Sequence, residues 1–206
     1  MVERIDLPSW EWQGGKAIGF NVAFVGMECI VGASKAPMNT LIAANIHCLE
    51  QGIDLLEEMP GSVYSMSCPE VFGSSIGGHF RHNLDHYVAF KRSFSTGSID
   101  YDQRDREISM ETDPAVAQSV MRELCEYFHG LADKDLNTPL RIRMDDGGDS
   151  TWSATSLRRE LQFLLSHTIH HYALVVSIAT RSGHTEFPEG FGVAPSTLHY
   201  LEEKGA

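Results

Sequence analysis

The chain has 206 residues, a length that suits one domain with a full hydrophobic core. Its 28 Asp and Glu outnumber its 16 Lys and Arg, so the formal net charge is −12. Because a phosphate backbone attracts Lys and Arg, this balance speaks against a nucleic-acid or anionic-membrane partner and favours a small molecule.

The most apolar stretch of the chain and the spacing of its cysteines indicate the cellular compartment. Residues 17–33 include Glu28 and are shorter than the ~20 apolar residues of a membrane span. The residues before them lack the basic region of a secretory signal. We therefore expect no membrane segment and a cytoplasmic protein. The four cysteines are Cys29, Cys48, Cys68 and Cys125, and no two of them form a CxxC pair. Scattered cysteines of this kind are typical of a reduced compartment and do not indicate a Cys-based zinc site.

Residues 1–36 have neither a helical nor a strand period, so we predict an N-terminal extension of uncertain structure before a domain of residues 37–206. The domain opens with a predicted helix over 37–59. Pro60 and Gly61 end that helix. Its apolar residues step by four, three, four and three, as on one helix face: Ile42, Ile46, Leu49, Ile53 and Leu56.

Three further helices are predicted from caps and apolar periodicity. The second begins after Ser74 or Ser75 and extends to about residue 94. The third opens at Asp113 as N-cap, with Pro114 at the first helical position, and stops before residue 133. The fourth covers about 156–182 and ends at a glycine that suits a C-cap.

The links between these helices complete the predicted architecture. Residues 95–112 are long enough to cross along a bundle, and 140–152 predict a short β-hairpin at its edge, outside the core. A short helix, capped at Pro195 or Ser196, follows the last long helix. The sequence therefore predicts an all-α four-helix bundle with a long crossover and a small β-hairpin before the last helix.

Six of the ten histidines lie on two of the predicted helices. In "GGHFRHNLDHY" three of them step by three and four along one stripe, and "SHTIHHYALV" adds a pair four residues apart with one between. Single core histidines are usually hydrogen-bonded structural groups. Two facing stripes favour a metal site instead, because one ion satisfies several imidazole lone pairs. The six are His79, His82, His86, His167, His170 and His171.

These stretches, with "IDYDQRDRE", "RRELQFLLSHTIHHYALV" and "FGVAPSTLHYLE", resemble the DinB/YfiT-like superfamily over residues 37–203. That superfamily includes bacillithiol and mycothiol transferases and the metal-binding domain of ergothioneine-synthesising enzymes. The resemblance implies that His82, His167 and His171 are the metal ligands. Helix geometry alone does not select His82, since His79 and His86 lie slightly closer to the apolar centre, and His86 is the first substitute.

A three-histidine site with an open position is typical of catalytic metal sites, and zinc, nickel or iron would accept it. The resemblance thus implies a metal-dependent enzyme that activates water or a thiol, of hydrolase or thiol S-transferase type. The expected partner is a small-molecule substrate, with a low-molecular-weight thiol as one candidate, and a homodimer is a further option. The alternative is a non-catalytic metal- or ligand-binding bundle.

Two acidic residues near the histidines, Glu160 and Asp85, are candidates for a general base or an orienting group. Glu160 lies two turns before His167, but an acidic residue in a first helical turn is explained by the helix dipole. Asp85 projects about 100° away from His86 around the helix. Residues 100–107, "DYDQRDRE", predict a solvated charged loop. None of these is assigned a catalytic role.

Overall fold

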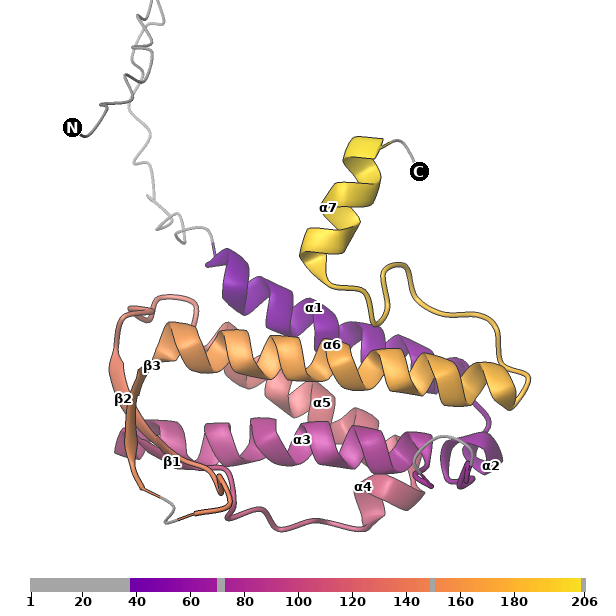
Figure 1. Cartoon of the computed structure of the whole chain (residues 1–206), viewed down its shortest axis with the longest axis horizontal. Coiled ribbons are helices and arrows are strands. Elements are labelled where there is room, and N and C mark those ends of the chain that lie inside the picture. Colours follow the sequence, from indigo (N-terminus) through magenta and orange to yellow (C-terminus); the bar gives the residue numbers. More distant parts are fainter. Residues whose placement is uncertain (1–37, 70–72, 149–150, 205–206) are drawn as a thin grey trace, which may run out of the picture. The chain divides into compact units, whose positions relative to one another are not determined.

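The computed structural model describes residues 38–69, 73–148 and 151–204 (Figure 1). The predicted extension, residues 1–36, lies outside them. Four long helices are present: α1 (Thr40–Glu58), α3 (Ile76–Ser93), α5 (Pro114–His129) and α6 (Leu157–Arg181). Each agrees within a few residues with a predicted helix. The shorter helices are α2 (Gly61–Tyr64), η1 (Phe94–Thr96), α4 (Ser109–Thr112) and α7 (Pro195–Lys204).

Side-chain caps explain why the long helices begin where they do. Ser75 Oγ accepts a hydrogen bond from the Gly78 amide, and Asp113 accepts one from the Ala115 amide. Each cap satisfies one backbone N–H that the first helical turn leaves without a partner. Asn39 and Ser156 cap α1 and α6 in the same way. The predicted caps at the second and third long helices are therefore confirmed.

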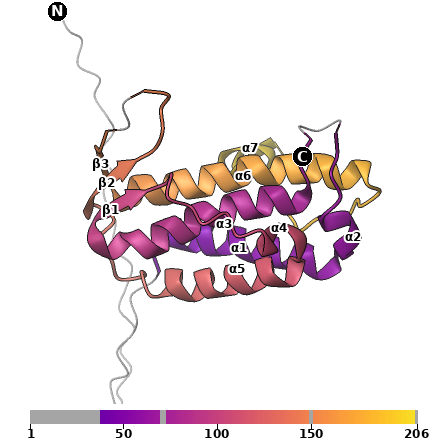
Figure 2. The same cartoon turned by 90° about the horizontal axis from the view of Figure 1, so that it is seen from below.

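The four long helices form a bundle in which each packs against two neighbours (Figures 1 and 2). Helix α1 contacts α5 and α6, and α3 contacts the same two helices from the other side. The segment between α3 and α5 runs along the bundle to α4, so α5 starts at the same end as α3 (Figure 1). The predicted crossover is confirmed, and it makes α3 and α5 run in the same direction.

A small sheet covers the end of the bundle where α3 ends and α6 begins (Figures 1 and 2). Strands β2 (Pro139–Arg143) and β3 (Ser153–Ser156) pair antiparallel, which confirms the hairpin, although β3 lies just beyond the predicted range. A third strand, β1 (Ser98–Asp100), pairs parallel with β2 and was not predicted. The hairpin was expected to lie outside the core, and this is wrong. Leu140 of β2 is buried with the helix core, as is Ile99 of the adjoining β1.

Buried polar groups tie three of the helices together inside the bundle. Tyr87 donates to Asn45 Oδ1 at 3.0 Å, and Thr168 Oγ1 lies 3.3 Å from the Tyr87 hydroxyl oxygen. Asn45 in turn donates to the Leu161 carbonyl oxygen at 3.1 Å. Each of these groups thus has the partner that burial requires.

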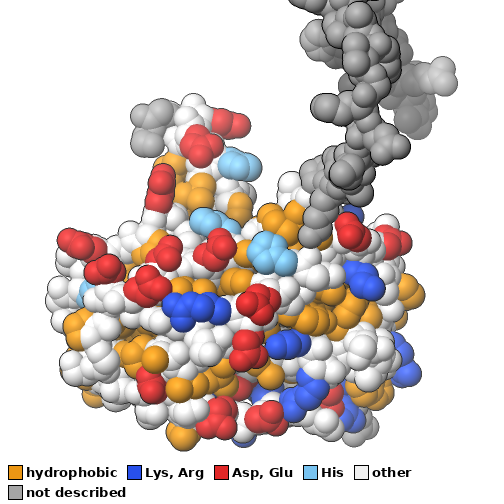
Figure 3. Space-filling view, turned by 180° about the vertical axis from the view of Figure 1, so that it is seen from behind, with side chains coloured by type: hydrophobic (Ala, Val, Ile, Leu, Met, Phe, Trp, Pro, Cys, Tyr) orange, Lys and Arg blue, Asp and Glu red, His pale blue; other side chains and the backbone are white. Residues whose placement is uncertain are grey.

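The face of the molecule opposite to that of Figure 1 carries acidic side chains spread widely, with basic ones among them (Figure 3). Among the helices of the described ranges, none combines the length and the apolar character needed to cross a bilayer.

Candidate metal centre

Histidines of α3 and α6 meet in antiparallel pairs across the helix interface. His82 Nε2 lies 3.2 Å from His167 Nε2, and His79 Nδ1 lies 2.9 Å from His171 Nδ1. One turn further along α3, the His86 ring centroid is 4.5 Å from that of His167. Because residues three or four apart share one helix face, two antiparallel helices bring these five rings into one cluster.

The five rings do not contribute equally to the cluster. Within the described part of the chain, His82, His86 and His167 form the one group of His, Cys, Asp or Glu whose ligand atoms all lie within 4.8 Å of one another. His171 adjoins it, with its ring centroid 4.7 Å from that of His82 and 4.6 Å from that of His167. His170 is exposed on the outer side of α6. His82 and His167 therefore come together as predicted, with His86 and His171 on either side.

The separation between His82 and His167 suits a shared ion. Two nitrogens bound to zinc at 2.0–2.1 Å in a tetrahedral site are about 3.3 Å apart. The observed Nε2···Nε2 distance is 3.2 Å. Two facing imidazole nitrogens at this distance must share either a proton or a cation. The donor set, imidazoles only, is one that late divalent metals accept.

Hydrogen bonds behind the rings determine which nitrogen atoms carry lone pairs. His86 Nδ1 donates to the His82 carbonyl oxygen at 2.8 Å, which leaves the lone pair of His86 on Nε2. His171 has a similar support in His79, whose Nδ1 faces its own. If His171 donates there, its lone pair is on Nε2. Such backing of a ligand ring is usual in metal sites. His79 Nε2 is buried and has no hydrogen-bond partner among the described residues.

Burial keeps the cluster neutral at physiological pH. Loss of solvent, with the neighbouring imidazoles as a smaller cause, lowers the pKa of His82 to about 4 and the pKa of both His167 and His171 to about 3. The pKa values of His79 and His86 are also lowered, mainly by burial. Metal binding requires neutral imidazoles, so these rings are in the state that a divalent ion needs.

Aromatic rings enclose one side of the cluster. Phe163 stacks on His167 with ring centroids 5.5 Å apart, and Tyr101 lies 5.6 Å from His86. Beside His167 a surface cavity of about 410 Å³ opens along α6. Its lining consists of Arg159, Gln162, Phe163, Ser166, His167 and His170.

The environments of Arg104 and Glu160 were not predicted. Arg104 belongs to segment 100–107, which was expected to be solvated. This is wrong for Asp100 and Tyr101, since both are buried. Arg104 from the same segment reaches the cluster, with Nη1 3.5 Å from His82 Nδ1 and 3.4 Å from His86 Nε2. Nothing in the sequence around Arg104 indicates this contact.

Glu160 is the second residue whose environment was not predicted. It is 1% exposed and accepts hydrogen bonds from Tyr101 Oη at 2.8 Å and Thr155 Oγ1 at 2.6 Å. The helix-dipole explanation of Glu160 is thus incomplete, because its carboxyl also joins β3, α6 and the segment after β1. A signal existed in the sequence, since Glu160 lies on the apolar stripe of Leu157, Leu161 and Leu164.

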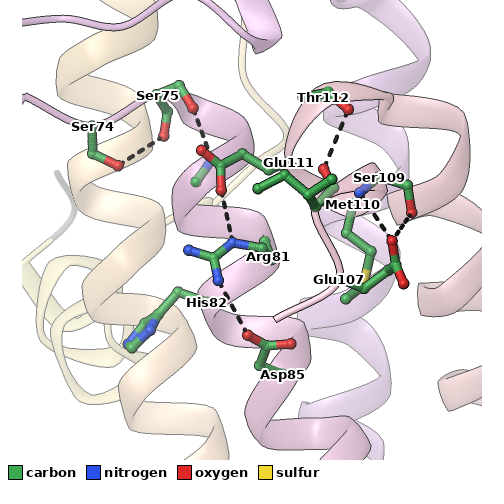
Figure 4. Close-up of polar contacts among 12 residues, drawn as sticks. Ser74, Ser75, Arg81, His82, Asp85, Glu107, Ser109, Met110, Glu111 and Thr112 are labelled. Carbon is green, nitrogen blue, oxygen red and sulfur yellow. Dashed lines mark hydrogen bonds and ion pairs between the residues drawn. The ribbon is translucent and has the colours of Figure 1, made fainter. Parts of the chain in front are cut away.

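Asp85 faces away from the histidines, as predicted. Its carboxylate lies 3.5 Å from Arg81 Nη1, and Arg81 Nε also donates to Glu111 at 2.8 Å. Figure 4 shows Arg81 between these two carboxylates, while the His82 ring extends to a different side of α3. The acidic residue nearest to the histidines in sequence therefore serves an ion-pair cluster between α3 and α4.

Comparison with solved structures finds proteins of similar fold. In solved structures, the fold is similar to the DinB-like protein YjoA of Bacillus subtilis, with a TM-score of 0.55 and 21% identity over 74% of this chain and 98% of that one. It is equally similar to YfiT of Bacillus subtilis, a probable metal-dependent hydrolase with an unusual four-helix bundle topology (TM-score 0.55, 17% identity, 79% of this chain and 95% of that one).

Sequence comparison extends the likeness. FK506-binding protein 5 of Rhizopus delemar is 33% identical over 109 residues, which are 52% of this chain and 28% of that protein. The chain thus matches less than a third of that relative's length. The sequence pattern of the DinB superfamily matches residues 51–175, which include all six histidines of α3 and α6. With its bundle, crossover and histidine cluster, the chain belongs to the DinB superfamily.

Proposed function

We propose that this protein is a metal-dependent enzyme in which His82, His167 and His171 hold a divalent ion. The observation that carries the proposal is the 3.2 Å approach of His82 Nε2 to His167 Nε2 between two helices. That separation matches two nitrogens on one ion, and the low pKa values keep the rings unprotonated. Zinc, nickel and iron all suit a set of three imidazoles.

The chain's own residues would orient and shield such a centre. His79 would keep the His171 ring in place through their 2.9 Å contact, and Phe163 would exclude water from one side of His167. A bound ion with three protein ligands supplies Lewis acidity at an open position, which prepares a water or a thiol as a nucleophile. The cavity beside His167 would admit the substrate.

The reaction class is therefore proposed as hydrolysis or thiol S-transfer on a small molecule, in a cytoplasmic protein. YfiT, a probable metal-dependent hydrolase, has the same fold and favours the first class. The resemblance to thiol transferases favours the second.

A second candidate function has its own supporting observation. The His86 ring centroid lies 4.8 Å from that of His82 and 4.5 Å from that of His167. If His86 completed a four-histidine cage, the ion would have no open position, and the bundle would be a non-catalytic metal-binding protein.

Cobalt substitution separates the two functions. Protein purified without a nickel column would be loaded with Co²⁺ and titrated with azide, with visible absorption as the readout. An open site changes its spectrum saturably as azide enters, whereas a closed cage does not respond. Loss of hydrolysis or thiol transfer on addition of chelator, and its recovery with metal, would then establish catalysis. A chain that binds no stoichiometric metal would contradict both functions.

A further inference from the structure

Arg104 is the one cationic side chain in contact with the histidine cluster in the described part of the chain. Its Nη1 lies 3.5 Å from His82 Nδ1 and 3.4 Å from His86 Nε2. These distances are at the long end of the hydrogen-bond range, so the guanidinium is held only weakly by the two rings. The side chain is half-buried, and its Nε is buried without a hydrogen-bond partner among the described residues.

No carboxylate lies within ion-pair distance of Arg104 in the described part of the chain. Other arginines do have acidic partners: Arg81 has Asp85 and Glu111, Arg92 has Asp105, and Arg143 has Asp100. Arg106 of the same segment also has no ion pair, but its side chain is exposed, whereas that of Arg104 is half-buried. Arg104 Nη1 contacts two imidazoles at long distance and forms no ion pair, so the head of the guanidinium retains hydrogen-bonding capacity for an acceptor from outside the chain.

The backbone around Arg104 is fixed from both sides. Arg92 of α3 donates to the Gln103 carbonyl oxygen at 2.6 Å and to both carboxylate oxygens of Asp105 at 3.0 and 3.1 Å. On the other side, Tyr101 is buried and bonded to Glu160. Arg104 therefore projects from a segment held on both flanks, which lowers the entropy cost of using it to bind a ligand.

Metal binding at His82 would free this guanidinium further. A neutral imidazole has one lone-pair nitrogen, so coordination through His82 Nε2 puts the proton on Nδ1. A protonated Nδ1 cannot accept a hydrogen bond from Arg104. The contact at 3.5 Å is then lost, and His86 Nε2 remains as the one described partner of Nη1.

From these observations we propose that Arg104 binds an oxyanion of the substrate, so that the substrate of this centre is an anionic small molecule. The guanidinium fork matches a carboxylate with two parallel hydrogen bonds. Arg104 lies outside the lining of the cavity beside His167, so it would hold that group at the His82 and His86 side of the ion while the open position takes the reacting atom. This inference rests on the proposed metal-dependent function, and the test below distinguishes the failure of one from the failure of the other.

The test compares small thiols on the full-length cobalt-loaded protein. The probes are 3-mercaptopropionate and 2-mercaptoethanol, which differ in an anionic group, and 2-mercaptoethanesulfonate, which replaces the carboxylate by another oxyanion. Each is titrated at one pH and followed by visible absorption. We expect 3-mercaptopropionate to bind the wild type about tenfold or more tightly than 2-mercaptoethanol, as one charged hydrogen-bonded pair would give. Sulfonate binding equal to carboxylate binding would indicate a general oxyanion site.

The variants identify the residue responsible. Arg104→Gln should take up the same one equivalent of cobalt and lose the preference for the anionic thiol, because the guanidinium that pairs with the carboxylate is gone. The ratio of the two Kd values is compared between variant and wild type, so that the difference in thiol pKa between the two probes cancels. Arg106→Gln, an equal charge change at an exposed position of the same segment, should keep the preference. Arg104→Lys should retain only part of it, since lysine lacks the fork. If Arg104→Gln does not fold, as judged by circular dichroism, Arg104→Lys carries the test.

The two possible failures give different results. A cobalt-loaded Arg104→Gln variant that responds to the thiols and keeps the wild-type preference would overturn the oxyanion inference alone. If the wild type binds no cobalt, or if its cobalt spectrum does not change with any of the thiols, both the proposed centre and this inference would be overturned.

Discussion

His86 Nδ1 donates a hydrogen bond to the carbonyl oxygen of His82, 2.8 Å away and one turn earlier on α3. Because a carbonyl oxygen only accepts, the proton is on Nδ1 and the lone pair is on Nε2. His86 is therefore chemically competent as a ligand, although the resemblance to the DinB/YfiT-like proteins implies His171 instead. The choice between these two residues is open to a direct test.

The first prediction concerns the ligand set. His82→Gln, His167→Gln and His171→Gln should each lose bound metal, while His86→Gln should keep about one equivalent. Helical content should stay nearly unchanged in all four, because the apolar stripes of the bundle hold the fold. Elemental analysis and circular dichroism measure the two quantities. Metal lost from His86→Gln but retained by His171→Gln would assign the centre to His82, His86 and His167.

The second prediction concerns pH. In the unfolded chain, histidines protonate near ~6.5, whereas the folded pKa values of His82, His167 and His171 are about 4, 3 and 3. Below pH ~6.5 the unfolded state therefore binds more protons than the folded state, so the stability of the metal-free protein must fall as the pH drops toward these folded values. Urea unfolding of metal-free protein at pH 7.5 and pH 5 measures the difference.

Histidine variants provide the control for that pH dependence. His167→Gln should reduce the loss of stability between the two pH values, whereas His129→Gln, at an exposed position on α5, should leave it as in the wild type. An unfolding midpoint that is equal at both pH values would contradict a neutral, desolvated cluster. Bound metal should also leave as protons compete for the imidazoles, and retention at pH 4 would indicate carboxylate or thiolate ligands.

The third prediction concerns Glu160. Replacing Glu160 with Leu removes the carboxylate that accepts hydrogen bonds from Tyr101 Oη and Thr155 Oγ1. We expect a loss of about 1–3 kcal/mol in the free energy of unfolding. Arg158→Gln, two residues earlier and exposed, should change it by less than about 0.5 kcal/mol. Equal stability of the two variants in urea titrations would show that this buried carboxyl does not hold the sheet to α6.

The fourth prediction concerns close packing at the middle of α1. A Cβ at Gly52 would collide with the Tyr172 hydroxyl and lie 2.9 Å from Met121 Sδ. Gly52→Ala should thus destabilise the bundle by about 1–3 kcal/mol, despite the better helix propensity of alanine. At Gly61, in α2, no atom lies within 4 Å of an added Cβ, so Gly61→Ala should not destabilise. A stable Gly52→Ala variant would mean that Tyr172 repacks at little cost.

Local signals in the sequence were sufficient for the four long helices. Ser75, Asp113 and Pro114 mark helix starts, and apolar residues at steps of three and four mark the buried faces. A helix depends on hydrogen bonds and contacts within four residues, so its limits can be read without knowing its neighbours. The same holds for the histidine stripes, since their spacing alone places the rings of each stripe on one side of their helix.

Contacts between distant segments were decided only by the tertiary structure. The parallel pairing of β1 with β2 joins residues about 40 apart in the sequence, and no turn motif between the two strands indicates that they pair. Arg104 and Glu160 read as surface charges because their partners, His82 and Tyr101, come from other elements. The sequence by itself thus determined which histidines share a helix face. Which ring nitrogens face each other, and which charged groups stand beside them, depends on helix rotation and register, and these are set by packing of the whole core.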